Sequence, residues 1–251
     1  MPHQSNTILA PGLEPLHYLG PPLSSGPLPA VFYFSLSAEE SLSLDPFNQP
    51  ALRLAELGVR VFSITLPAHH GAFPHPHAMQ EWLEDIQTGG KVIGDFIATC
   101  TASIDYLIEQ GWIDPHRIGA AGLSRGAYIA FLLAAEDQRV RSVAGFSPLT
   151  RFAALDDVSD SPMKQVILSD LKNYADRLSN KKVKVYIGNN DTRVSTSSCY
   201  GFIEALTHSA VSHKHRPPPI EMVIYPSIGH KGHGTPKHIF ESGAEWLAAI
   251  L

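Results

Sequence analysis

Short apolar runs alternate along this chain with longer segments of helical character. The apolar runs predict strands at 30–37, 59–67, 118–121, 139–150, 181–188 and 220–226, with a short edge strand at 16–20. The intervening segments predict helices at 45–58, 79–110, 127–135, 161–178, 195–211 and 235–251, the second of them with a break at Thr88-Gly89-Gly90. Strands that alternate with helices predict an α/β fold, in which a mostly parallel sheet is covered by helices on both faces.

Turn and capping residues divide the chain further. Asp45 is expected to cap the helix that Pro46 begins and Gly58 ends, and Thr235 is expected to cap the last helix, with Pro236 at its first position. Residues 1–29 are rich in proline and glycine and are expected to form an irregular N-terminal arm. Because no break in composition divides the rest, we expect a single domain over 1–251.

The segment Gly122-Leu123-Ser124-Arg125-Gly126 is a G-x-S-x-G motif between a predicted strand and a predicted helix. In that setting a sharp turn holds the central serine in a strained conformation at the edge of the sheet, and the glycines remove side chains that would collide with the neighbouring strand and helix. The same pattern also fits an ordinary glycine-rich turn. The remaining strand ends therefore decide whether Ser124 is a candidate nucleophile.

The ends of two later strands carry an acid and a histidine. Asp191 follows the strand that ends at Gly188, and His230 follows the strand that ends at Pro226. Because ligands in open α/β sheets bind beyond the carboxyl ends of the strands, we expect these side chains to meet Ser124. His233 lies in the same loop as His230. We favour His230 as the partner of Ser124 because of its distance from the strand, and place His233 beside the substrate or in loop packing.

Composition narrows the classes of function. The chain has 251 residues, 44% of them hydrophobic, and a net charge of -5, which argues against a nucleic-acid partner. No apolar run is long enough to span a bilayer, the N-terminus lacks the features of a secretory signal, and two cysteines are too few for a disulfide framework. We expect a cytoplasmic location, a small-molecule partner, no membrane association, no cofactor, and no metal, since the thirteen histidines form no metal-binding motif. The oligomeric state is not predicted.

From about Ala30 onward the chain resembles the α/β-hydrolase superfamily. The stretches "IDPHRIGAAGLSRGA" and "GNNDTRV" are most similar to the dienelactone hydrolase and prolyl oligopeptidase-like branch, and the order serine, acid, histidine is that of this fold. The resemblance implies a three-layer α/β-hydrolase fold, with residues 151–180 in the position where many hydrolases insert a lid. Those 30 residues leave room for only a small cap segment.

The resemblance implies a role for each candidate residue. Ser124 is the expected nucleophile, His230 its base and Asp191 the acid that orients the histidine. The Arg125 amide is the first expected oxyanion donor, and the Leu36 amide is the second by position, with Ser35 next. The expected pocket residues are Ser35, His69, His70 and His233. For His69 and His70, a position in the solvated loop is an equal alternative.

These residues predict a cofactor-independent serine hydrolase that cleaves an ester or another small acyl compound through an acyl-enzyme. Two alternatives stay open. One is a peptidase of the prolyl oligopeptidase-like type, although such enzymes usually carry a large additional domain. The other is a binding protein on a hydrolase scaffold, without turnover.

Overall fold

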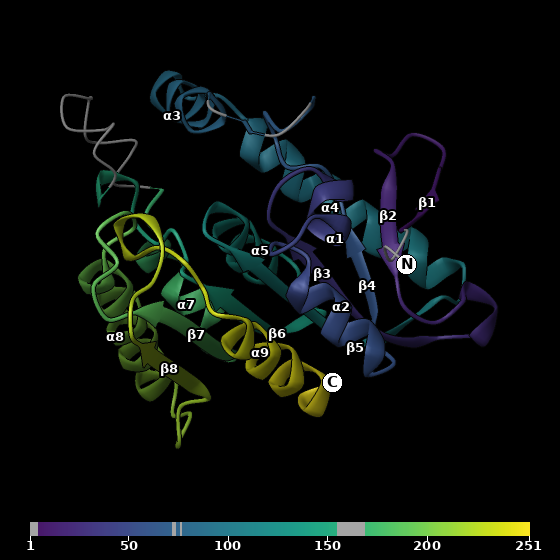
Figure 1. Ribbon diagram of the computed structural model, residues 1–251. Coiled ribbons are helices and arrows are strands. Elements are labelled where there is room, and N and C mark those ends of the chain that lie inside the picture. Colours follow the sequence, from purple (N-terminus) through teal and green to yellow (C-terminus); the bar gives the residue numbers. More distant parts are fainter. Residues whose placement is uncertain (1–4, 72–73, 76, 155–168) are drawn as a thin grey trace.

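The computed structural model describes residues 5–71, 74–75, 77–154 and 169–251, and within them one eight-stranded sheet runs through the molecule (Figure 1). Its strands are β1 (Asn6–Ile8), β2 (Leu16–Leu19), β3 (Leu28–Phe34), β4 (Arg60–Ser63), β5 (Ile113–Leu123), β6 (Val140–Phe146), β7 (Lys182–Gly188) and β8 (Ile220–Tyr225). Their order across the sheet is β1-β2-β4-β3-β5-β6-β7-β8. The pairs β1·β2 and β2·β4 are antiparallel and all others are parallel, as the alternation of strands and helices predicts.

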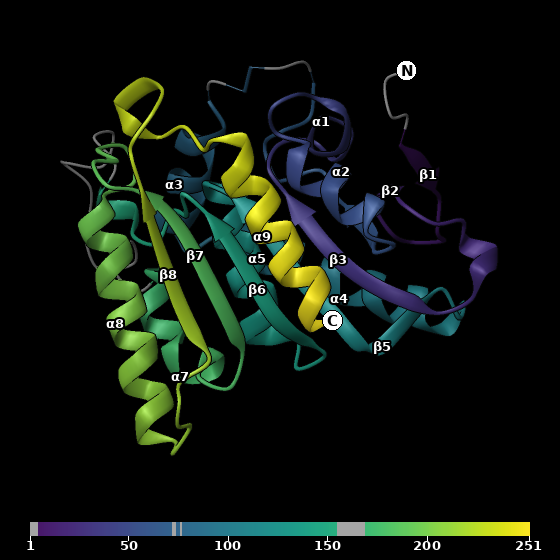
Figure 2. The same cartoon turned by 60° about the horizontal axis from the view of Figure 1, so that its bottom comes forward.

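Helices cover both faces of the sheet (Figure 2). One face carries α1 (Ala38–Ser43), α2 (Gln49–Glu56) and α9 (Lys237–Ile250). The other carries α3 (Ala78–Thr88), α4 (Val92–Glu109), α5 (Arg125–Glu136), α7 (Ala175–Leu178) and α8 (Thr196–Ser212). Alternating residues of β3 divide between the two cores: Val31 and Tyr33 pack toward α2 and α9, whereas Phe32 and Phe34 pack toward α4 and α5. No helix in the described part of the chain is long and apolar enough to cross a membrane.

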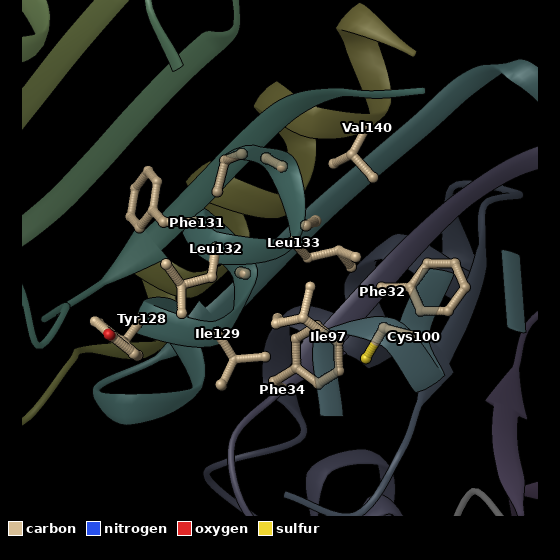
Figure 3. Close-up of a cluster of buried hydrophobic side chains, with 14 of the residues drawn as sticks. Phe32, Phe34, Ile97, Cys100, Tyr128, Ile129, Phe131, Leu132, Leu133 and Val140 are labelled. Carbon is tan, nitrogen blue, oxygen red and sulfur yellow. The ribbon is translucent and has the colours of Figure 1, made fainter. Parts of the chain in front are cut away.

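Helix α5 is the most deeply buried helix of the larger core. Every residue from Gly126 to Ala135 is buried, so the helix is apolar on all sides. Figure 3 shows Phe34, Ile97 and Cys100 gathered beside Ile129 of this helix. Because α5 is packed along its whole length, the position of its first residue is fixed, and so is the turn that precedes it.

The N-terminal arm contains more regular structure than the sequence predicts. Within its described residues, β1 and β2 extend the sheet beyond β4, and a 3₁₀ turn, η1 (Leu23–Ser25), follows them. The buried Arg60 fixes the proline-rich segment, because its guanidinium donates to the carbonyl oxygens of Pro21, Pro22, Gly26 and Trp112. The strand expected at 16–20 is confirmed as β2, which pairs with β4. The expectation that the rest of the arm is irregular is wrong at β1, which pairs with β2, and at η1.

Two predicted helix starts differ from the observed ones. Asp45 caps no helix, because the chain forms α1 first, with Ser37 and Glu40 as a capping box, and then α2 after Asn48. Thr235 does not cap α9, which begins at Lys237 after Pro236. The predicted break in the helix at 79–110 is confirmed by the end of α3 at Gly89, whose φ is +71°.

The predicted cap segment and helix at 151–180 lie partly outside the described residues, which omit 155–168. The parts that are described form short turns: η2 (Phe152–Ala154), η4 (Leu171–Tyr174) and α7. Leu171 and Leu178 are buried in the larger core, so this end of the segment is packed against the domain.

Gly126 sets the distance between α5 and β3. A Cβ atom at this position would lie 2.0 Å from the carbonyl oxygen of Phe34, closer than any side chain tolerates. Gly201, by contrast, lies in α8 with open space around it.

We predict that Gly126→Ala lowers the free energy of unfolding by about 1–3 kcal/mol or more, because helix and strand must move apart. Gly201→Ala is the matched control, and it should raise the free energy of unfolding by about 0.5–1 kcal/mol through helix propensity alone. Urea unfolding monitored by circular dichroism measures both. Equal stability of the two variants would contradict the close contact at Gly126.

Candidate active site

Ser124 lies in the turn between β5 and α5 with a strained backbone, at φ +56° and ψ -117°. Its amide donates to the Phe146 carbonyl oxygen at 2.9 Å, and its own carbonyl oxygen accepts from the Leu149 amide at 3.0 Å. A Cβ atom on Gly122 would lie 2.3 Å from the backbone of Gly126, so the turn closes only with glycine there. This is the strand-turn-helix geometry that the G-x-S-x-G motif predicts.

His233 joins Ser124 to Asp191. Its Nε2 lies 3.0 Å from Ser124 Oγ, and its Nδ1 lies 2.7 Å from Asp191 Oδ2. The Asp191 side chain is fully buried, whereas the His233 side chain is 16% exposed. An imidazole that donates through Nδ1 to a carboxylate presents Nε2 as an acceptor, which is the tautomer that can take a proton from a hydroxyl.

The Asp191 carboxylate is held by the loop after β7. Its Oδ1 accepts the backbone N–H groups of Arg193 at 3.0 Å and Val194 at 3.1 Å, which leaves Oδ2 for His233. The Asp191 amide in turn donates to Thr196 Oγ1 at 3.0 Å, and that hydroxyl donates to the Gly188 carbonyl oxygen. The acid is therefore oriented from both sides, at the strand end where the sequence predicts it.

His230 does not lie between Ser124 and Asp191, so the expectation that it does is wrong. It begins a short 3₁₀ turn, η5 (His230–Gly232), and its side chain is exposed. The loop then folds back on itself, as the bridge between Ile228 and Gly234 shows. This reversal carries His233 to Asp191, and a count of residues from the end of the strand cannot reveal it.

Backbone contacts join the loop that carries His233 to the loop that carries Asp191. The Thr192 amide donates to the Lys231 carbonyl oxygen at 2.9 Å, and the Asn190 amide donates to Ser227 Oγ at 2.7 Å. Gly232 packs so closely that a Cβ there would lie 2.2 Å from the Asn190 carbonyl oxygen. The two loops therefore form one unit at the carboxyl edge of the sheet (Figure 2).

A buried hydroxyl cluster holds the far side of the same loop, and the sequence analysis missed it. Tyr225 Oη donates to the Gly234 carbonyl oxygen at 3.2 Å and lies 3.0 Å from Ser147 Oγ and 3.1 Å from Thr235 Oγ1. Ser147 is fully buried and has a φ of +40°. Thr235 thus anchors the residues after His233 to the sheet instead of capping α9.

The Arg125 amide, at the first position of α5, has no acceptor among the residues that the structure describes, as an oxyanion donor requires. The expected second donor does not fit. The Leu36 amide donates to Ser41 Oγ at 2.9 Å and the Ser35 amide donates to the same oxygen at 3.1 Å. The hydroxyl oxygen of Ser41, in α1, accepts both amides, so neither is available to an oxyanion. The spacing of residues in the sequence does not predict this contact.

A cavity of about 550 Å³ opens above Ser124 and His233. Ser35 and Leu36 line it just after the end of β3, Pro74 and His75 line it from the segment that leads to α3, and Met79 lines it from α3 itself.

His69 and His70 do not line this cavity, so their assignment to the pocket is wrong. His69 is fully buried, with Nδ1 donating to the Pro67 carbonyl oxygen at 2.8 Å, and burial lowers its pKa to about 4. His70 is exposed. The histidine of this segment that does line the cavity is His75, whose Nε2 lies 2.8 Å from Glu40 Oε2. Burial alone would raise the pKa of Glu40, but hydrogen bonds with His75 and Ser37 outweigh it and the pKa is lowered.

Comparison with known proteins relates most of the chain to one family. The model of the prolyl oligopeptidase family matches residues 77–251, which include Ser124, Asp191 and His233. A curated relative, the acylamino-acid-releasing enzyme 2 of Oryza sativa subsp. japonica, is 25% identical over 123 residues. That match covers 49% of this chain and 15% of the relative.

Solved structures share the fold at low identity. The Porphyromonas gingivalis dipeptidyl peptidase 4 matches 97% of this chain and 35% of its own, with a TM-score of 0.69 and 20% identity. A cold-adapted esterase from an Arctic intertidal metagenomic library matches 98% of this chain and 93% of its own, with a TM-score of 0.66 and 17% identity. The three-layer architecture is thus an α/β-hydrolase fold, which this chain shares with a peptidase and with an esterase.

The close approach of Gly232 to Asn190 predicts a specific effect of substitution. We expect Gly232→Ala to move His233 away from Asp191 and to slow covalent labelling of Ser124 by a fluorophosphonate at least tenfold. Gly12→Ala is the matched control, because Gly12 has nearly the same φ, +75° against +72°, but nothing near its Cβ position. Both variants should lose about 1–2 kcal/mol of stability from the left-handed backbone, and only Gly232→Ala should lose labelling. An unchanged labelling rate in Gly232→Ala would contradict this account of the loop.

Proposed function

The chain belongs to the prolyl oligopeptidase family, and on that premise we propose that it is a serine hydrolase that cleaves an ester or another small acyl compound through an acyl-enzyme on Ser124. The observation that supports this best is the unbroken contact from Ser124 through His233 to Asp191, at 3.0 and 2.7 Å. A binding protein without turnover would need neither the strained serine nor its oriented base.

In the proposed acylation step, His233 Nε2 takes the proton of Ser124 Oγ as that oxygen attacks the substrate carbonyl carbon. Asp191 stabilises the imidazolium that forms and keeps the ring in its orientation. The imidazolium then gives its proton to the leaving group. In deacylation, water attacks the acyl-enzyme while His233 takes a proton from it, and Ser124 is released when the proton returns.

The oxyanion needs donors that are already in place before the reaction. We assign the first to the Arg125 amide, which begins α5 and has no acceptor in the described part of the chain. Because Ser41 occupies the amides of Ser35 and Leu36, we assign the second to the Ser35 hydroxyl, at the cavity wall.

A peptidase is the second candidate, and the comparisons favour it. The family is named after a peptidase, and the curated relative is an acylamino-acid-releasing enzyme. The chain covers only 15% of that relative, so the substrate of the relative does not transfer directly. Amides and esters pass through the same acyl-enzyme, and the two candidates differ in the leaving group that the site can protonate and expel.

The two histidines of the β8 loop should differ sharply in function. We predict that His233→Gln lowers kcat by about 10⁴-fold or more and abolishes labelling by a fluorophosphonate, as Ser124→Ala does, because the base is lost. His230→Gln is the control, since its side chain is exposed on the same loop, and kcat should change less than about threefold. Ester turnover and mass spectrometry of the labelled protein measure both effects. Loss of activity in His230→Gln with retention in His233→Gln would reverse the assignment.

A substrate panel should separate the two candidates. We predict that wild-type protein cleaves 4-nitrophenyl esters of two to six carbons and cleaves N-acetyl amino acid 4-nitroanilides no faster than Ser124→Ala does. The rate of Ser124→Ala is subtracted in each case. Anilide cleavage that depends on Ser124 would assign the chain to the peptidases instead, because activated esters are cleaved by both classes.

A further inference from the structure

The described residues that line the cavity above Ser124 carry positive charge although the whole chain carries a net charge of -5. Three cationic side chains line it: Arg125, Arg193 and Lys231. No aspartate or glutamate side chain is among its lining residues in the described part of the chain. Among the described lining residues the charge is therefore opposite in sign to that of the chain as a whole.

Of these three cationic residues, Arg125 is the most buried. It follows Ser124 directly, and its Nη1 atom is buried without a hydrogen-bond partner. Within the described residues, its guanidinium forms no ion pair and no side-chain hydrogen bond. A guanidinium has five N–H donors in a planar fork, and leaving buried donors unsatisfied is costly. The described residues supply no acceptor for this group, which can therefore bind one from a ligand.

Arg193 stands at the exposed side of the same cavity. Its backbone amide is fixed by Asp191 Oδ1 at 3.0 Å, so the loop that orients the acid also places this arginine. Arg193 forms no ion pair with the Asp191 carboxylate, whose Oδ1 accepts two amides and whose Oδ2 binds His233. No ion pair of Arg193 with another described residue occurs either.

The two arginines are close enough to affect each other. Burial and the positive charge of Arg193 lower the pKa of Arg125 to about 10, so Arg125 stays protonated at neutral pH. His69 carries no compensating negative charge, because it is buried and neutral, and its Nε2 has no hydrogen-bond partner among the described residues. A negative charge between the two guanidinium groups would relieve both the repulsion and the unsatisfied donors.

We propose that the substrate carries an anionic group, of the carboxylate class, a few bonds from the scissile carbonyl, and that Arg125 and Arg193 bind this group together. The proposal rests on the serine hydrolase function proposed above and names its substrate class. Arg125 then has two separate roles: its backbone amide faces the oxyanion and its side chain selects the substrate.

Matched esters test the charge without changing the length of the substrate. The first pair is 4-nitrophenyl hemisuccinate and 4-nitrophenyl methyl succinate, in which the acyl group is charged or neutral. The second pair is 4-acetoxybenzoate and its methyl ester, in which the leaving group is charged or neutral. The rate with Ser124→Ala is subtracted in each case, because such esters also hydrolyse without enzyme.

We expect wild-type protein to prefer the anionic member of one pair in kcat/KM. Arg125→Gln should reduce that preference by about 10- to 100-fold, which is the effect of losing a charged hydrogen-bond partner. Arg193→Gln should reduce it in the same direction and serves as the second variant if Arg125→Gln does not fold. Arg141→Gln is the control. It removes the same charge from an exposed site near the start of β6, where the parallel strands begin and away from the carboxyl ends that carry the site, and it should leave the preference unchanged.

The absence of a preference in both pairs would overturn the proposal, and so would a preference that neither arginine variant changes. Failure of the proposed function gives a different result, since neither the charged nor the neutral esters would then be cleaved and Ser124 would not be labelled.

Discussion

The contact between the backbone of α5 and the end of β3 constrains everything else at this site. Gly126 brings the helix against the Phe34 carbonyl oxygen, and Gly122 lets the preceding strand approach the same point. Between them Ser124 takes a backbone conformation that few residues adopt, and burial of α5 on all sides holds it there. The position of the serine is thus set by close packing of backbones, and its side chain stays available for chemistry.

The same packing explains why the sequence predicts this part of the site well. Glycines around a serine, between a buried strand and an alanine-rich helix, leave little choice of geometry, and Asp191 lies at a strand end whose position is fixed by the sheet. His233 could not be separated from His230 in this way. The distance along the chain from β8 favours His230, but the reversal of the loop at Gly229, with a φ of +73°, and the bridge from Ile228 to Gly234 depend on contacts with other segments.

The other errors have related causes. The Leu36 amide stands at the expected place, and only the structure shows that Ser41 already occupies it. His69 belongs to a loop that looks solvated in the sequence, yet its ring packs beside Trp82, at 6.4 Å between ring centroids, because Pro67 accepts hydrogen bonds from both side chains. In the N-terminal arm, Arg60 lies far along the chain from the carbonyl groups that it binds. Each case depends on where one side chain points, and the periodicity of the sequence does not determine that whether the partner is near, as for Ser41, or distant, as for Arg60.

The hydrogen bonds between the β7 and β8 loops also bear on how the chain acquires its chemistry. His233 is 109 residues from Ser124 and 42 from Asp191 along the chain, and it reaches them only when β8 is paired with β7 and its loop is folded back. Contacts of such separation form late, because the entropy of closing the intervening chain must first be overcome. Until β8 and its loop are in place, Ser124 has no base to activate it. In the proposed chemistry, the nascent protein therefore stays inert towards acyl compounds until its last strand is in place.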